Sequence, residues 1–341
     1  MFALSSCNED FDIDTIGEDP LMVVYCFPST SDTTIIQVSV STPMNQSIRP
    51  DLETDISNAD ISYRVNGYDY PVIAVGHGEY YAIGKHSVND LVDILVSADS
   101  LPSVSGTATI PTDCSIQLNS VKRIQRYDRD SGTTIPQDQI AATFTDVSSA
   151  KDYYAFRVKM RSYKGTASAY TLNERGEKVA SQYTKIATME QYLQLKAQHP
   201  ELEWEFNYTQ VVNSYPTLNL EDEPLLHPIN KVDDQFGFTN LFYQNFYIVD
   251  DATFNGESYT LHLNVPAKLT VGNFKEEYQV EIYYITKDFY KFIKSINDVE
   301  NNDLAVRGFS LVTPTASNVT GGIGLIGAFN KSESSFKSRN N

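Results

Sequence analysis

The side chains that could carry catalytic or metal chemistry are few, and their spacing fits none of the common motifs. Five histidines occur, with no His-Glu-x-x-His or similar close pair among them: His77, His86, His199, His227 and His262. His77 and His86 could meet across a hairpin, but a zinc site needs further ligands nearby. There is also no Gly-x-Ser-x-Gly nucleophile turn. We therefore expect no catalytic residue, no metal ligand and no cofactor, in a chain that is not an enzyme.

Two acidic clusters make calcium an alternative. Asp250 and Asp251 lie close to Asn255 and Glu257, and a second group lies within residues 298–303. Ca²⁺ prefers oxygen ligands, but neither spacing is that of an EF-hand loop, whose ligands recur at alternate positions. Charged clusters are common in a chain with a net charge of −18. The pattern therefore favours solvated turns for both groups.

A glycine-rich segment near the end of the chain has the spacing of a dinucleotide motif. Gly322-Ile323-Gly324-Leu325-Ile326-Gly327 fits Gly-x-Gly-x-x-Gly. That motif binds a dinucleotide only when a helix follows and an acidic residue stands about 20 positions further on. Too few residues remain for this arrangement. The glycines are better explained by a final strand that lies close to another backbone.

A third motif lies at the start of the chain, which reads Met1-Phe2-Ala3-Leu4-Ser5-Ser6-Cys7. An apolar residue three positions before a cysteine, with small residues between them, resembles the lipobox of bacterial lipoproteins. We expect residues 1–7 to be the end of a signal peptide, shortened by a late start codon or truncation, and Cys7 to carry a lipid anchor. An ordinary buried cysteine is the alternative.

Residues 8–19 are rich in Asp and Glu and show no apolar periodicity. Like charges keep such a segment extended and solvated, so we expect an acidic tether between the anchor and a folded body. Acidic residues directly after a lipidated cysteine also resemble the signal that sends Bacteroidota lipoproteins to the outer leaflet of the outer membrane. A plain solvated linker is the alternative.

Two further chemical expectations follow from that compartment. With Cys7 lipidated, Cys26 and Cys114 remain as an even pair, which could form a disulfide; a buried thiol at Cys26 is the alternative. Three Asp-Ser/Thr-apolar triplets resemble the O-glycosylation sites of Bacteroidota, although chance matches are expected in a Thr-rich chain. Their acceptor residues are Thr15, Thr33 and Ser100.

The overall charge excludes one class of partner. The chain has 44 Asp and Glu against 26 Lys and Arg. Binding to a phosphate backbone needs clustered Lys and Arg. We therefore expect no nucleic acid as a partner.

Strand patterns fill residues 20–113. Residues 21–27 are continuously apolar and residues 34–40 alternate, as paired strands do. Asn66-Gly67 predicts a type I′ hairpin turn. Further strands are expected at residues 61–65, 78–82 and 90–96. Short strands between turns predict an immunoglobulin-like antiparallel β-sandwich.

Residues 114–330 are predicted to form a larger β-sandwich-like domain, followed by a polar tail at 331–341. Its strands are expected at residues 141–146, 153–160, 259–265 and 278–284. Thr188 and Gln191 have the spacing of a capping box, which predicts a helix that ends near His199. A second helix has apolar residues at i, i+3, i+4 and i+7, namely Phe289, Phe292, Ile293 and Ile296. We expect both helices to pack on the sheet.

Several segments carry a resemblance to a known family. They include residues 21–40, Asn58-Ala59-Asp60-Ile61, Gly78-Glu79-Tyr80, Phe254-Asn255-Gly256-Glu257-Ser258-Tyr259, residues 288–295 and, most specifically, Asn318-Val319-Thr320-Gly321-Gly322-Ile323-Gly324. With these, the chain from Cys7 to about Phe329 resembles domain-of-unknown-function family 4249, lipoproteins of Bacteroidota. Residues 165–226 align poorly, and Leu325-Ile326-Gly327-Ala328 departs from the Phe-Gly-like step of the family. Members are encoded beside TonB-dependent outer-membrane receptors, and the family carries no activity to transfer.

These observations predict a mainly-β, two-domain lipoprotein on the outer membrane. The resemblance implies a non-enzymatic binding or docking accessory of a TonB-dependent transporter, with the loops at the ends of the sandwiches as contact surface. One alternative is a surface adhesin or glycan-binding protein that stacks exposed tyrosines and Trp204 on sugar rings. A second is a hydrolase that acts on a surface substrate.

Overall fold

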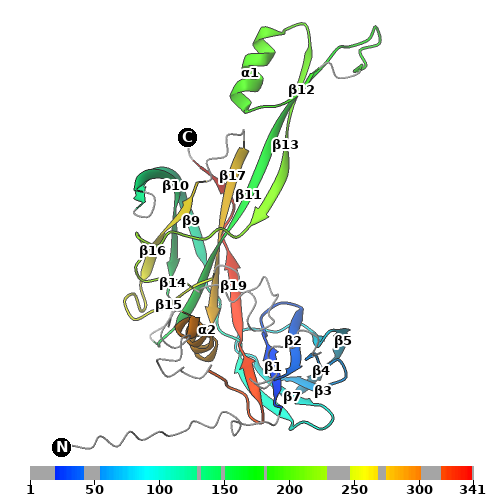
Figure 1. The fold of residues 1–341 in the computed structure, drawn as a ribbon, viewed down its shortest axis with the longest axis vertical. Helices are drawn as coiled ribbons and strands as arrows, with labels where there is room; N and C mark the ends of the chain where they lie inside the picture. Colours follow the sequence, from blue (N-terminus) through cyan, green and yellow to red (C-terminus); the bar gives the residue numbers. More distant parts are fainter. Residues whose placement is uncertain are drawn as a thin grey trace, which may run out of the picture. The chain divides into compact units, whose positions relative to one another are not determined.

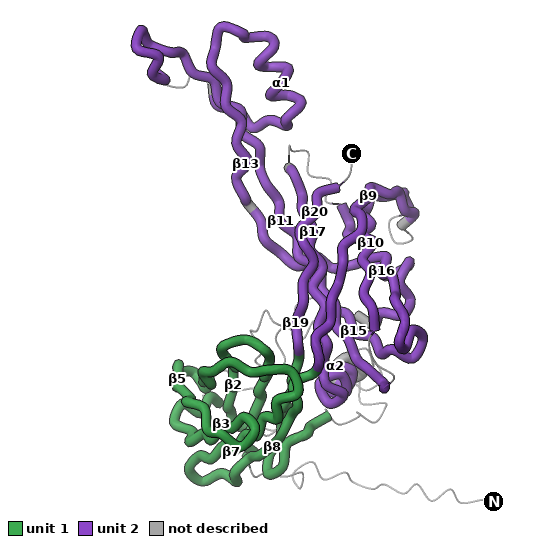
Figure 2. Tube along the Cα trace, turned by 180° about the vertical axis from the view of Figure 1, so that it is seen from behind, with its two compact units in different colours: residues 1–111, 315–329 green, residues 112–314, 330–341 purple. Residues whose placement is uncertain are grey.

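The computed structural model describes residues 20–41, 54–128, 132–146, 150–179, 183–228, 246–267, 274–300 and 316–339. The fold is mainly β, as the sequence predicted, and divides into two compact units (Figure 2). Unit 1 contains residues 1–111 and 315–329, and unit 2 contains residues 112–314 and 330–341. No helix in the described part of the chain is both long enough and apolar enough to cross a membrane.

Unit 1 is a sandwich of two sheets. One sheet has the order β18 (Ile323–Ile326), β1 (Met22–Cys26), β2 (Thr33–Val40), β6 (Glu79–Ile83) and β5 (Val72–Gly76). The other has the order β4 (Tyr68–Tyr70), β3 (Asp60–Val65), β7 (Leu91–Ser97) and β8 (Val104–Thr109). Both sheets contribute to one buried core, with Val24 and Ile36 from the first and Tyr63 and Ile94 from the second. Alternate residues of β1 and β7 are buried, which confirms the strand pattern.

The hairpin between β3 and β4 also follows the sequence prediction. Asn66 and Gly67 have φ angles of 51° and 83°, the positive values that a type I′ turn requires. Asn66 also accepts a hydrogen bond from the Leu91 backbone N–H through its side chain (2.9 Å), which ties the turn to β7.

The last strand of unit 1 corrects the predicted domain boundary. We expected residues 114–330 to form one domain, yet β18 pairs in parallel with β1, so residues 315–329 belong to unit 1. Gly324 has a φ of 140°, and a Cβ added there would lie 1.8 Å from the carbonyl oxygen of Val24. The interpretation that the glycines permit a close backbone approach is therefore confirmed. A strand follows the motif in place of the helix that a dinucleotide site needs.

Unit 2 also contains two sheets around one core. The smaller has the order β16 (Ser258–Pro266), β10 (Thr133–Thr145) and β9 (Ile116–Asp128). The larger has the order β14 (His227–Pro228), β15 (Tyr247–Asp250), β11 (Tyr153–Tyr170), β17 (Phe274–Ile285) and β19 (Phe329–Glu333). Also in this sheet, β12 (Tyr183–Ile186) and β13 (Glu203–Ser214) pair with β11, and β20 (Lys337–Ser338) pairs with β17. Phe144 from the smaller sheet and Phe156 and Val280 from the larger one meet in the core.

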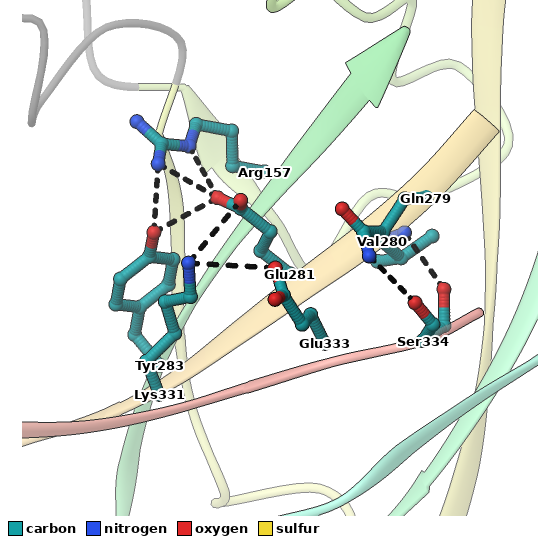
Figure 3. A network of polar contacts seen from close by, with 8 residues as sticks. All are labelled: Arg157, Gln279, Val280, Glu281, Tyr283, Lys331, Glu333 and Ser334. Atoms are coloured by element: carbon teal, nitrogen blue, oxygen red, sulfur yellow. Dashed lines mark hydrogen bonds and ion pairs between the residues drawn. The ribbon is translucent and has the colours of Figure 1, made fainter. Parts of the chain in front are cut away.

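The prediction that residues 331–341 form a polar tail is wrong, because β19 and β20 continue the larger sheet beyond residue 330. Ser334 holds this segment through backbone and side-chain hydrogen bonds with Gln279 and Val280 of 2.8 to 3.0 Å (Figure 3). Hydrogen bonds to a sheet edge need no apolar side chains, so the composition of this segment concealed its pairing.

The two helices differ in how they pack. In α2 (Lys287–Glu300), Phe289, Phe292 and Ile293 are buried as predicted, and the Tyr290 ring lies 4.8 Å from that of Tyr153 in β11. α1 (Met189–Gln198) has the predicted capping box, but none of its residues is fully buried. Both helices therefore pack on the larger sheet, as predicted, but α1 lies at the far end of β11 and β13 (Figure 1), where its Tyr192 and Leu195 pack against Trp204 and its small neighbours.

Candidate functional site

Part of unit 2 projects from the rest of the unit as an arm (Figures 1 and 2). This arm is the first candidate for a surface that binds another protein. β11 pairs with β17 only as far as Lys164, then continues to Tyr170 with β13 and β12 as its neighbours. We define the arm as residues 165–208. It contains the last third of β11, together with β12, α1 and the start of β13. The sequence pattern did not predict the arm, because the expected strand ended at residue 160, whereas β11 runs to Tyr170.

A small core of its own supports the arm. Ala167, Ala169, Ala187 and Trp204 are buried together. The small side chains of β11 leave room for the aromatic side chains of β13: a Cβ added at Gly165 would lie 2.6 Å from the Phe206 ring. These small residues at alternate positions were the sequence signal that could have indicated the arm.

Trp204 is part of this core and not of a sugar-binding surface. It is 8% exposed, and its indole N–H donates to the carbonyl of His199 at 3.0 Å. The ring of Tyr192 in α1 lies edge-on to it at 6.4 Å. The expectation that Trp204 stacks on a ligand is therefore wrong, because α1 and the end of the hairpin cover it.

The outside of the arm presents apolar side chains to solvent. Each of six is at least 43% exposed: Leu172, Val179, Ile186, Met189, Leu193 and Tyr208. They come from the hairpin strands, the loop that follows β11 and α1. Single exposed apolar residues are ordinary, but several on one projecting element are typical of a protein-contact surface.

A second candidate lies inside unit 2, where three aspartates from three segments meet. Asp146 follows β10, Asp152 precedes β11 and Asp251 follows β15. We call these residues the aspartate cluster. One carboxylate oxygen of each lies within 4.8 Å of the other two, and the exposed fractions are 2%, 5% and 1%.

Two tyrosines and one backbone amide orient the cluster. The Tyr154 hydroxyl donates to Asp146 and the Tyr284 hydroxyl donates to Asp152. Burial, followed by these acceptors and the neighbouring carboxylate charges, raises the pKa of both tyrosines. The Gly256 N–H donates to Asp146 Oδ2 at 2.6 Å. Both phenols therefore remain protonated donors throughout the physiological pH range.

The comparisons with known proteins bear on the whole chain. A family model described as Domain of unknown function (DUF4249) matches residues 8–335. The chain belongs to this family. The match agrees with the resemblance carried by the individual segments and includes both units. Among curated proteins, none matches this DUF4249 chain.

The structure separates the predicted acidic turn of the DUF4249 chain into two parts. Asp250 is half-buried and pairs with Lys151 at 2.8 Å, whereas Asp251 is buried in the aspartate cluster. The prediction of a solvated turn is therefore wrong for Asp251, because the turn from Asp251 to Glu257 folds back on the ends of β10 and β11. The side chains of the acidic group at 298–303 lie outside the described residues.

The histidines of the predicted hairpin have different environments. His77 is exposed in a turn, while His86 is buried. His86 shares a 2.8 Å hydrogen bond with the Tyr63 hydroxyl and stacks on Tyr70. Burial lowers the pKa of His86. Among the described residues, neither histidine belongs to a group of three ligand side chains.

Cys26 and Cys114 are free thiols, so the structure does not contain the disulfide that the sequence allowed. Cys26 is fully buried in the core of unit 1. Cys114 packs against the core of unit 2, and its thiol points to the carbonyl of Asn330 at 3.9 Å. Each side chain is held by the packing of its own unit.

The predicted modification sites of the DUF4249 chain fall partly outside the described residues, as Cys7 and Thr15 do. Thr33 begins β2 and is exposed, and Ser100 is exposed in a turn with a φ of 65°. Glycosylation at these sites stays a prediction.

Proposed function

We propose that this protein is a lipid-anchored, surface-exposed lipoprotein of a bacterial outer membrane, and that it acts as a non-enzymatic docking accessory of a TonB-dependent receptor. The lipobox-like segment before Cys7, the acidic stretch after it and the resemblance to Bacteroidota lipoproteins support the location. The arm supports the docking role. It is the observation that carries the proposal.

The arm has the properties that a docking element needs. Its buried core gives it a defined shape, so little conformational freedom is lost on binding. Its exposed apolar side chains would gain from burial in a partner at about 25 cal/mol per Å² of apolar surface. Leu193 is 56% exposed and Tyr208 is 43% exposed, and neither belongs to the core of the unit 2 body. In this proposal the receptor covers these residues.

Affinity purification from solubilised outer membranes tests the role. We expect the native protein to recover a TonB-dependent receptor, and the double variant Leu193→Ser/Tyr208→Ser to recover much less of it at an unchanged thermal midpoint. Gln194→Ser is the matched control, because Gln194 is also exposed on α1 but polar. Recovery of no such receptor by the native protein would reject the accessory role. Equal recovery by the double variant would reject the arm as the contact.

A separate variant tests the anchor. Exported in a bacterial host, the native protein should fractionate with membranes, and Cys7→Ser should release it to the soluble fraction. Retention of the variant in membranes would contradict lipidation at Cys7.

A further inference from the structure

We propose that the aspartate cluster of unit 2 binds a calcium ion through Asp146, Asp152 and Asp251. Calcium–oxygen bonds measure 2.3–2.6 Å, so two oxygens on one ion lie at most about 5 Å apart. The three carboxylate oxygens lie within 4.8 Å of one another, and each pair can therefore share one ion. This inference is independent of the docking role.

The Asp251 side chain indicates a missing ligand. It is 1% exposed, and among the described residues its Oδ2 has no hydrogen-bond partner. A buried carboxylate oxygen without a donor is costly, since it has lost its hydration and gained nothing in return. The same residue contributes an oxygen to the cluster, where a cation would replace the missing hydration.

The charge of the site also favours a bound cation. Asp251 continues the antiparallel register of β11 and β15, in which Tyr153 opposes Asp250, and so it stands opposite Asp152. Like charges opposite each other on paired strands repel. No Lys or Arg in the described part of the chain forms an ion pair with Asp146 or Asp251, and the nearby Lys151 is engaged by Asp250. A divalent cation would offset the repulsion of all three carboxylates.

The chemistry of the donors selects the ion. All three ligands are carboxylate oxygens, which suit calcium, magnesium and manganese better than zinc or copper. Magnesium requires near-octahedral bonds of 2.0–2.1 Å and usually keeps several waters, whereas calcium accepts more protein ligands in flexible geometry. A buried site that gathers three carboxylates from separate segments fits calcium better.

The position of the site defines what the ion would do. Asp146 directly follows a strand of the smaller sheet, and Asp152 and Asp251 directly flank β11 and β15, adjacent strands of the larger one. A bound ion would therefore link the two sheets of unit 2. The carboxylates are at most 5% exposed, so they fit a structural cation better than reaction with a substrate.

The test uses the full chain, stripped of metal with EDTA and transferred to chelator-free buffer. We expect millimolar CaCl₂ to raise the thermal unfolding midpoint and to give a saturable calorimetric isotherm, with a weaker response to MgCl₂ at equal ionic strength. Bound terbium should also emit on tyrosine excitation, because Tyr154 and Tyr284 contact the ligands. No calcium-dependent change in the native protein would overturn the proposal, and an equal magnesium response would overturn the assignment to calcium.

A pair of adjacent variants identifies the ligands. Asp251→Asn should weaken calcium and terbium binding by at least about tenfold, while Asp250→Asn should bind both like the native chain, since Asp250 pairs with Lys151 outside the cluster. In EDTA, Asp251→Asn should unfold at or above the native midpoint, because it removes one of three repelling charges. Unchanged binding by Asp251→Asn, or equal losses in both variants, would reject this site. If Asp251→Asn does not fold, the titrations of the native chain still decide the proposal.

Discussion

Replacing Glu281 by glutamine should cost unit 2 a large part of its stability. Glu281 lies in β17 and is fully buried, and it accepts hydrogen bonds of 2.7 Å from Arg157 and 2.8 Å from Tyr283 (Figure 3). Lys331 approaches the same carboxylate at 3.4 Å from a more exposed position. Arg157 is itself only 5% exposed. The substitution would therefore leave a buried guanidinium charge facing a neutral amide.

The magnitude follows from the loss of that partner. Removing one member of a buried ion pair costs about 3–5 kcal/mol, and a Coulomb estimate at 4 Å with an effective dielectric constant of 20 gives about 4 kcal/mol. Arg157 would keep its 2.7 Å contact with the Tyr283 hydroxyl and its position 3.8 Å above the Tyr215 ring. We therefore expect a loss of unfolding free energy at the lower end of this range, about 3 kcal/mol. For a unit of this size, that loss lowers the thermal unfolding midpoint by roughly 6–12 °C.

The stability that Glu281 contributes should depend on pH. Burial raises the pKa of Glu281, but the Arg157 and Lys331 charges lower it by more, so the net pKa lies below its ordinary value of 4.5. The ion pair thus contributes stability that is complete above about pH 4.5 and is lost as the pH falls through the lower folded pKa. The difference between the native chain and Glu281→Gln should shrink in that acidic range.

Urea unfolding followed by near-ultraviolet circular dichroism measures both effects. Glu333→Gln is the matched control, because Glu333 also pairs with Lys331 at 3.4 Å but is 45% exposed. The control should remain within about 0.5 kcal/mol of the native chain. If Glu281→Gln also unfolds within 1 kcal/mol of the native chain at pH 7, the reasoning about the buried guanidinium is refuted.

Two further predictions concern unit 1 and the thiols. Gly324→Ala should destabilise the chain by about 3 kcal/mol through backbone strain and the clash with Val24. Gly67→Ala, which is also at positive φ but has open space around it, should cost about 1 kcal/mol. Equal losses of stability in urea unfolding would contradict the close approach of Gly324 to Val24. Burial raises the pKa of Cys114 to about 12 and that of Cys26 further. Iodoacetamide should therefore label neither thiol readily in the native chain and both in guanidinium, and rapid native labelling would show that burial is incomplete.

The parts of the fold that the sequence predicted correctly depend on neighbouring residues. Alternation in β1 and β7 predicts their buried faces, because side chains of a strand point to opposite sides of the sheet. Asn66-Gly67 predicts its turn because these two residues accept positive φ angles. The apolar spacing of α2 and the capping box of α1 are equally local.

The missed parts depend on pairings between distant residues. β18 pairs with β1, which lies about 300 residues earlier in the chain, so that Ile323 stands opposite Val23. No local pattern shows whether such a strand pairs with β1 in unit 1 or with a strand of unit 2. The arm continues β11 through small residues such as Gly165 and Ala167, whose low hydrophobicity hides a strand until Phe206 is known to fill the space they leave.

The aspartate cluster shows most clearly why composition could not find a site. Asp251 lies in a polar turn, and a net charge of −18 makes an exposed carboxylate the natural expectation there. Its burial follows from register: once Tyr153 opposes Asp250, Asp152 must oppose Asp251 at the end of the same ladder. Asp146 then joins them from the facing sheet. The signal in the sequence was thus the position of each aspartate beside the end of a strand. Only the pairing of those strands brings the three separate positions together as one set of ligands.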